Sequence, residues 1–107
     1  MITKHLSIVS LILLFGIFLH AQEKDGLDRY KMENSSLTHR PDIVFMGNSI
    51  TEFWSIERPD FFKAKPWVNR GISGQTTPQM LVRFRQDVIE LKPRIVVILA
   101  GTNDIAG

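Results

Sequence analysis

Three short polar stretches in this sequence contain the residue types that acyl transfer needs. Each follows an apolar run, and they read GNSIT at 47–51, NRGISG at 69–74 and GTND at 101–104. The Ser49 hydroxyl is suited to nucleophilic attack, and the backbone N–H of Gly71 and the side-chain amide of Asn103 are suited to hold an oxyanion. The three stretches therefore predict a site for attack on a carbonyl carbon.

Each of these residues also has a purely structural interpretation. Ser49 and Glu52 have the spacing of a capping box at a helix start. Gly71 fits a turn that needs positive φ, and Asn103 fits a loop after a strand. For each residue taken singly, the structural role is favoured. The occurrence of all three at successive strand ends instead favours a catalytic site.

The apolar runs before these stretches predict three strands. They are short, rich in β-branched and aromatic residues, and bounded by glycine or proline: 43–46, 67–69 and 95–100. The continuous apolar run at 95–100 indicates a strand buried on both faces, as in parallel α/β sheets. The carboxyl ends of such strands meet at one edge, where ligands of open α/β sheets bind.

Helices are predicted between the strands. The first covers 49–56 and ends before Arg58 and Pro59, and an aromatic loop then leads to the second strand. The second begins with Thr77 as a capping hydroxyl before Pro78. Its apolar face is predicted to contain Leu81, Phe84, Val88 and Leu91, with Arg83, Arg85, Asp87 and Glu90 mostly off that face. Two helices cannot cover both faces of three strands, so we expect 41–107 to be part of a larger domain.

The N-terminus has the pattern of an export signal. Lys4 supplies positive charge, 6–19 is uncharged and mostly apolar, and cleavage is predicted after Ala21. The apolar stretch is shorter than the roughly 18 residues of a membrane span, although an uncleaved N-terminal anchor is the alternative. We expect a signal peptide at 1–21, a polar, partly helical lead-in at 22–40, and an exported protein, periplasmic or extracellular.

Charge and cysteine content exclude several classes of function. The formal net charge is +2, and +1 without Lys4, so no basic patch implies a nucleic-acid partner. The sequence has no cysteine and hence no disulfide, thiolate nucleophile or cysteine metal site. No phosphate-binding glycine motif is complete, so nucleotide binding is not expected. The acyl-transfer chemistry described above needs neither a cofactor nor a metal.

The three stretches resemble the SGNH (GDSL-type) hydrolases over about 42–105. The resemblance implies a flavodoxin-like three-layer parallel sheet and a small-molecule ester substrate: an acetylated saccharide, an acyl ester or a lysophospholipid. It implies Ser49 as nucleophile, and an oxyanion hole made by the Ser49 N–H, the Gly71 N–H and the Asn103 amide.

The sequence departs from the family pattern at two places. Asn48 stands where the family usually has aspartate, and the Asp-x-x-His that supplies the base is absent. His39 precedes the first strand, which would put it about 20 Å from Ser49, too far for a general base. Two hypotheses stay open: the N-terminal part of an exported ester hydrolase whose histidine lies beyond residue 107, or a non-catalytic ligand-binding module or pseudoenzyme of the same fold.

Five aromatic side chains are candidates for an acyl pocket, although aromatic residues near strand ends are more often core. They are Phe53, Trp54, Phe61, Phe62 and Trp67.

Overall fold

A three-stranded parallel sheet organises residues 26–106, the part of the chain that the computed structural model describes. The strand order is β2-β1-β3, with β1 at Ile43–Gly47, β2 at Trp67–Gly71 and β3 at Ile95–Leu99. In the register, Phe45 of β1 lies opposite Asn69 of β2 and Val97 of β3. All three strands end at the same edge of the sheet, which confirms the predicted α/β class and the position of the polar stretches.

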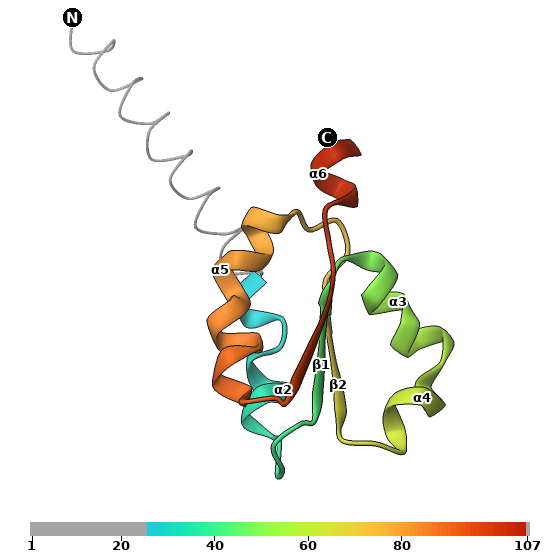
Figure 1. The fold of residues 1–107 in the computed structure, drawn as a ribbon, viewed down its shortest axis with the longest axis vertical. Helices are drawn as coiled ribbons and strands as arrows, with labels where there is room; N and C mark the ends of the chain where they lie inside the picture. The colour runs from blue at the N-terminus through green and yellow to red at the C-terminus, as the bar shows by residue number, and fades with distance from the viewer. Residues whose placement is uncertain (1–25, 107) are drawn as a thin grey trace, which may run out of the picture.

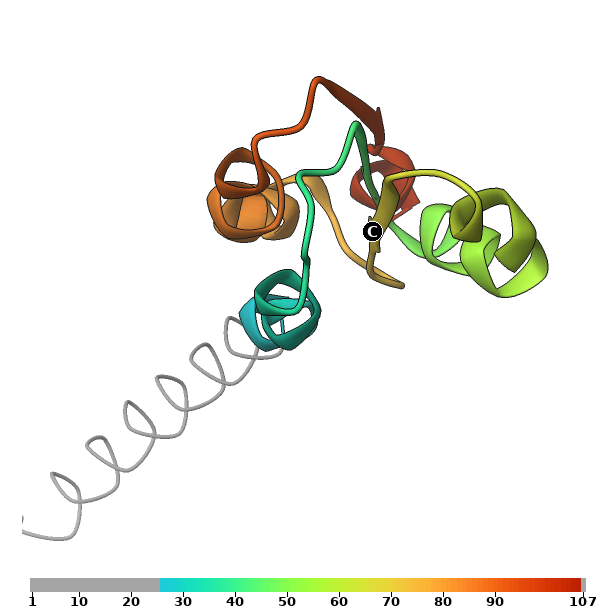
Figure 2. The ribbon, with the colours of Figure 1, turned by 90° about the horizontal axis from the view of Figure 1, so that it is seen from below.

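Helices lie on both sides of this sheet and complete three layers (Figures 1 and 2). On one side are α2 (Lys31–Ser35), α5 (Thr77–Asp87) and the 3-10 turn η1 (Ile89–Leu91). On the other side are α3 (Ser49–Glu57) and α4 (Pro59–Lys63). The short α6 (Thr102–Ala106) follows β3 above the carboxyl ends of the strands. The predicted loop at Phe61 and Phe62 is helical instead, because Pro59 occupies the first helical turn.

The central strand supplies apolar side chains to both layers. Val44 and Met46 are buried with Met80 and Val88 of the α5 layer. Phe45 points to the opposite side, where its ring lies 5.2–6.0 Å from the rings of Trp54, Phe61, Phe62 and Trp67. Four of the five candidate pocket aromatics thus form a partly buried cluster around Phe45, in which Trp54 is 38% exposed, while Phe53 is 51% exposed.

The predicted apolar face of α5 is partly wrong. Phe84, Val88 and Leu91 pack on the core, but Leu81 is 74% exposed on the flank beside Ile98. Arg83 and Asp87, predicted off the packed face, are completely buried. The physical reason is that this part of α5 faces backbone carbonyls at the sheet edge, which need hydrogen-bond donors.

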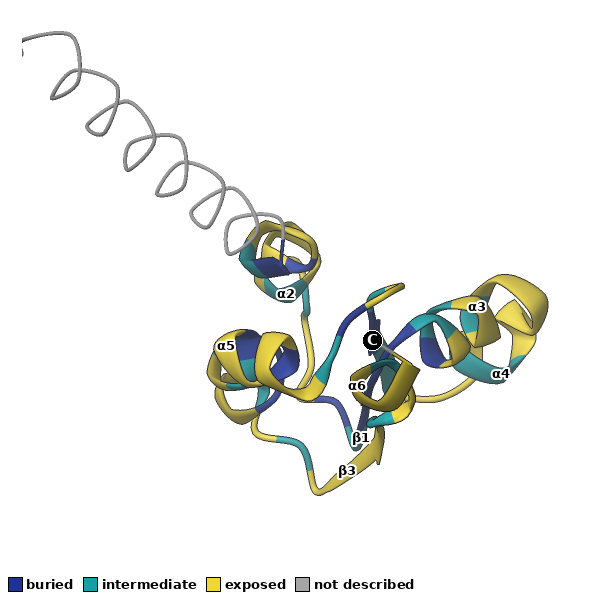
Figure 3. Cartoon of the chain, turned by 90° about the horizontal axis from the view of Figure 1, so that it is seen from above, coloured by how far each residue is buried: buried dark blue, intermediate teal, exposed yellow. Residues whose placement is uncertain are grey.

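The prediction that the third strand is buried on both faces is also wrong for the described residues. All five residues of β3 are exposed, by 36–58% of their surface, and β3 is an edge strand here (Figure 3).

No helix within 26–106 is long and apolar enough to cross a membrane. The predicted signal peptide lies outside the described residues.

Candidate functional site

The turn from β1 into α3 presents Ser49 as the first residue of the helix. Asn48 is the N-cap, buried, and its Oδ1 accepts a hydrogen bond from the Ile50 N–H at 3.1 Å. Asparagine thus serves the turn where the family usually has aspartate. Ser49 itself is partly exposed, and its N–H and hydroxyl have no protein partner within 26–106. Ser49 thus lies at the positive end of a nine-residue helix.

The predicted capping box of Ser49 and Glu52 does not form. The Glu52 carboxylate instead accepts a hydrogen bond from the Ser73 N–H at 2.9 Å, in the loop after β2. Because Asn48 already caps the helix, Glu52 is free to link α3 to this loop, which comprises residues 72–76.

Gly71 ends β2 against the first turn of α3. A Cβ at this position would lie 2.3 Å from the Glu52 nitrogen and 2.9 Å from the Asn48 oxygen, so no larger residue fits. The Gly71 N–H donates to Asn69 Oδ1 at 2.8 Å, and its carbonyl accepts from the Tyr30 hydroxyl at 2.5 Å. The N–H predicted as an oxyanion donor therefore already has a partner in this structure.

A second glycine in the same stretch leaves its backbone open. Gly74 has φ +79° in a turn that the Gln75 N–H closes onto the Ile72 carbonyl. Within the described chain the Gly74 N–H has no hydrogen-bond partner, and nothing lies within 4 Å of where its Cβ would be. The sequence signal for this residue is its position as the second glycine of the turn-forming stretch 69–74, three residues after Gly71.

Asn103 lies in α6, and its side chain reaches the loop from the other side. Asn103 Nδ2 donates to the Gln75 carbonyl at 3.0 Å, which leaves its second N–H without a protein partner in the described chain. The neighbouring Asp104 accepts hydrogen bonds from the Thr77 hydroxyl and, at 2.9 Å, from the Thr77 N–H at the start of α5. These two bonds, the hydroxyl first, hold the pKa of Asp104 below its ordinary value of 3.8.

The loop 72–76 therefore links the elements that carry the three predicted site residues. It contacts α3, which begins at Ser49, through Glu52, and it contacts Asn103 through Gln75. Gly71 immediately precedes it. The start of α5 is fixed by Thr76, whose side chain and backbone form a capping box with Gln79, so the cap is one residue earlier than predicted.

Buried charged and polar groups support this loop from below. The Arg83 guanidinium donates to Gln75 Oε1 at 2.6 Å, to the Arg70 carbonyl at 2.8 Å and to the Gly47 carbonyl at 3.2 Å. It also forms an ion pair with Asp87 at 3.2 Å, and both side chains are 0% exposed. Burial lowers the pKa of Arg83, and the hydrogen bond to Asp87 and the charge of that carboxylate oppose this shift. Every buried side-chain nitrogen and oxygen among the described residues has a partner.

Other candidate features lie away from Ser49. His39 is exposed at the opposite end of β1, with a ring nitrogen 3.0 Å from the Thr38 hydroxyl.

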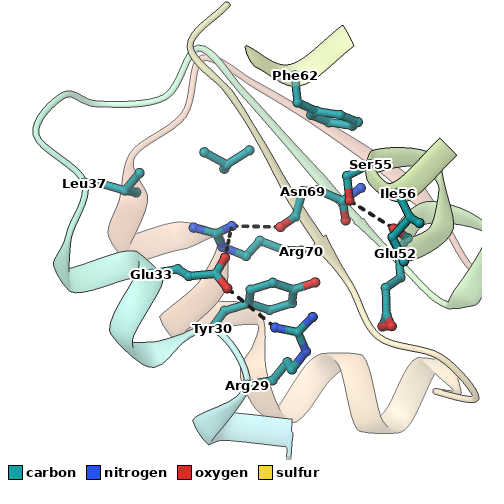
Figure 4. A pocket seen from close by; sticks show the side chains of 11 residues that line it. Arg29, Tyr30, Glu33, Leu37, Glu52, Ser55, Ile56, Phe62, Asn69 and Arg70 are labelled. Atoms are coloured by element: carbon teal, nitrogen blue, oxygen red, sulfur yellow. Dashed lines mark hydrogen bonds and ion pairs between the residues drawn. The ribbon is translucent and has the colours of Figure 1, made fainter. Parts of the chain in front are cut away.

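An open cavity of about 370 Å³ lies beside β2 (Figure 4). It is lined by Tyr30 and Arg70, and by Glu33, which pairs with Arg70 at 3.8 Å. In 26–106, no three His, Cys, Asp or Glu side chains gather to hold a metal ion.

Comparison with known proteins gives consistent matches. Residues 45–107 match the GDSL-like Lipase/Acylhydrolase family. A crystal structure of a GDSL-like lipase from Bacteroides thetaiotaomicron is 54% identical, with a TM-score of 0.70 over 75% of this chain and 41% of that one. A candidate acylhydrolase from Bacteroides fragilis is 56% identical, with a TM-score of 0.70 over 75% of this chain and 40% of that one.

A curated relative is more distant. The uncharacterized lipoprotein YqeF of Bacillus subtilis (strain 168) is 37% identical over 79 residues, which is 61% of this chain and 32% of that protein. The chain thus spans about a third to two fifths of the length of these relatives.

Proposed function

Because the chain belongs to the GDSL-like lipase/acylhydrolase (SGNH) family, we propose that it is the N-terminal part of an exported serine ester hydrolase. The observation that carries this proposal is the loop 72–76, which links the helix that begins at Ser49 to the side chain of Asn103. A nucleophile at a helix start and a side-chain amide with a free N–H are two of the groups that acyl transfer requires.

In the proposed reaction the Ser49 hydroxyl attacks the ester carbonyl and the alcohol leaves, forming an acyl-enzyme. Water then releases the acid. The Ser49 N–H and the Asn103 amide stabilise the oxyanion of each tetrahedral intermediate. Gly71 is proposed as the backbone donor, which requires its N–H to be shared with or released from Asn69. Gly74 is the second candidate, supported by its free N–H.

We place the general base outside residues 26–106. His39 is the only histidine in that range, and it lies at the amino end of β1 whereas Ser49 follows the carboxyl end. A base must come within about 2.6–3.2 Å of the nucleophile, or one water further. We propose that an Asp-x-x-His segment beyond residue 107 supplies it.

The substrate class and the location are proposed from the family and from the N-terminus. The ester is an acetylated saccharide, an acyl ester or a lysophospholipid. Export is proposed from the signal pattern at 1–21, and the relative YqeF is described as a lipoprotein. The 107 residues contain no cysteine, so they offer no thiol for acylation.

The test is hydrolysis of p-nitrophenyl acetate and of an acetylated saccharide by the complete protein. We expect Ser49→Ala to abolish turnover, and Ser55→Ala, a serine in the same helix whose hydroxyl bonds the Glu52 carbonyl, to retain it. Undiminished turnover by Ser49→Ala would refute the assignment. A folded complete protein that binds but does not cleave esters would instead favour the second hypothesis, a non-catalytic module.

A further inference from the structure

The buried arginine of α5 has more partners than an ion pair needs. Arg83 and Asp87 are one helical turn apart, but only one of the four hydrogen bonds of Arg83 goes to Asp87. The others go to the carbonyls of Gly47 and Arg70, at the carboxyl ends of β1 and β2, and to the side chain of Gln75. The guanidinium thus fixes the loop 72–76 relative to the sheet edge.

Gln75 is bonded on two sides. Its Oε1 accepts from Arg83 Nε at 2.6 Å, and its backbone carbonyl accepts from Asn103 Nδ2 at 3.0 Å. The residue is 9% exposed. A single residue therefore lies between a fully buried charge and the amide that we propose as an oxyanion donor.

The backbone carbonyl of Gln75 determines the orientation of the Asn103 side-chain amide. Only the NH₂ end of the amide can donate to a carbonyl, so the Oδ1 end must turn away and the second N–H takes a fixed direction. The five-residue α6 is mostly exposed, and among residues 26–106 its side chains are held only by the hydrogen bonds of Asn103 and Asp104. Oxyanion donors act only when they are held in place before the reaction.

We propose that Gln75, held by Arg83, is the positioning residue that aims the Asn103 amide at the oxyanion. This inference rests on the ester-hydrolase function proposed above. Gln75 acts through Asn103 and does not itself touch the substrate. The loss of its side chain should therefore affect stabilisation of the transition state rather than substrate binding.

The experiment is a double-mutant cycle in the complete protein, with kcat and KM measured for a p-nitrophenyl ester. Gln75→Ala should lower kcat about 10- to 100-fold with KM within about twofold, because a small displacement of a catalytic group has effects of that size. Gln75→Glu keeps an oxygen acceptor for Arg83 and should recover most of kcat. In an Asn103→Ala background, Gln75→Ala should cost less than about twofold more.

Equal losses of kcat from Gln75→Ala in both backgrounds, or no recovery in Gln75→Glu, would overturn the positioning role. If Gln75→Ala fails to fold, Gln75→Asn, one methylene shorter, replaces it in the cycle. Failure of the proposed function looks different, because Ser49→Ala would then keep its activity. If Asn103→Ala alone keeps wild-type kcat, the positioning role falls with the donor it serves.

Discussion

The turn between β1 and α3 combines buried residues that hold its shape with a serine that is partly exposed. Asn48 and Thr51 are buried and hold the turn, while Ser49 between them is partly exposed. Gly47 lies so close to Thr51 and to the Leu99 carbonyl that a Cβ there would be 2.1 Å and 2.7 Å from them. A side chain at position 47 would therefore collide with α3 and with β3, so only glycine fits there.

At this scale the sequence predicted the residue types of the site but not their partners. The predicted helix start at Ser49 is confirmed, although the cap is Asn48 and not the predicted box of Ser49 and Glu52. That Asn69 would occupy the Gly71 N–H does not follow from any spacing rule, because it depends on side-chain rotamers at the strand end. The sequence could not show which glycine of the stretch keeps a free N–H.

Replacement of Asn103 by alanine tests the oxyanion role. In the complete protein we expect kcat for ester hydrolysis to fall about 10²–10³-fold, the usual effect of losing one oxyanion donor. Thr102→Ala, at the exposed neighbouring position, should leave kcat within about twofold and serves as control. Wild-type turnover in Asn103→Ala would remove Asn103 from the site.

Replacement of Gly71 by alanine tests the close approach of β2 to α3. The added Cβ would meet backbone atoms of Asn48 and Glu52, which cannot move aside, so we expect a loss of about 1–3 kcal/mol in the free energy of unfolding by urea. Gly26→Ala is the matched control, since its Cβ would meet only the end of the Gln75 side chain, at 3.2 Å. Equal stability of the two variants would contradict the packing described here.

Among the elements, α5 shows where periodicity is informative and where it fails. The core contacts of Phe84, Val88 and Leu91 follow the apolar pattern, but α5 ends at Asp87 and Leu91 lies in the 3-10 turn η1. The burial of Arg83 and Asp87 does not, because a helical pattern counts apolar side chains and contains no term for unpaired carbonyls at a sheet edge. The strand positions were predicted to within two residues because glycine and proline bound them.

The bond between α6 and the start of α5 should depend on pH. The Thr77 bonds lower the pKa of Asp104, so the ionised carboxylate stabilises the folded state above pH 3.8, and this contribution is lost as pH falls through the lowered pKa. We expect Asp104→Asn to lower Tm at pH 7 and to approach wild type below pH 3.8. Thr77→Val, which lacks the donating hydroxyl, should also lower Tm at pH 7 and approach wild type below pH 3.8. A Tm difference that is independent of pH would contradict the charge-based account.

The aromatic core between α3, α4 and the sheet should depend on Phe45. This ring is 6% exposed and contacts the other four, so Phe45→Ala should cost about 3–5 kcal/mol in the free energy of unfolding. Phe53→Ala, at a position 51% exposed, should cost less than about 1 kcal/mol. Thermal or urea unfolding of both variants checks the difference, and similar losses would mean that the cluster is not a core.

At the scale of the whole molecule, the apolar strand β3 remains exposed because no element within residues 26–106 covers it. Its exposed face accords with a chain that spans about two fifths of the length of similar solved structures. The sequence predicted a partial domain from the ratio of helices to strands. It also predicted burial for β3, because an apolar run indicates burial but does not show what covers the strand.

The central claim, that Ser49 is the nucleophile of an acyl-transfer site, is tested most directly by covalent trapping. The complete protein would be treated with a fluorophosphonate, which phosphonylates activated serine hydroxyls with loss of fluoride, and the modified residue located by mass spectrometry. We predict one adduct, on Ser49, absent from heat-unfolded protein and reduced by an ester substrate. An unlabelled Ser49 in folded protein that hydrolyses esters, or an adduct on another serine, would contradict it.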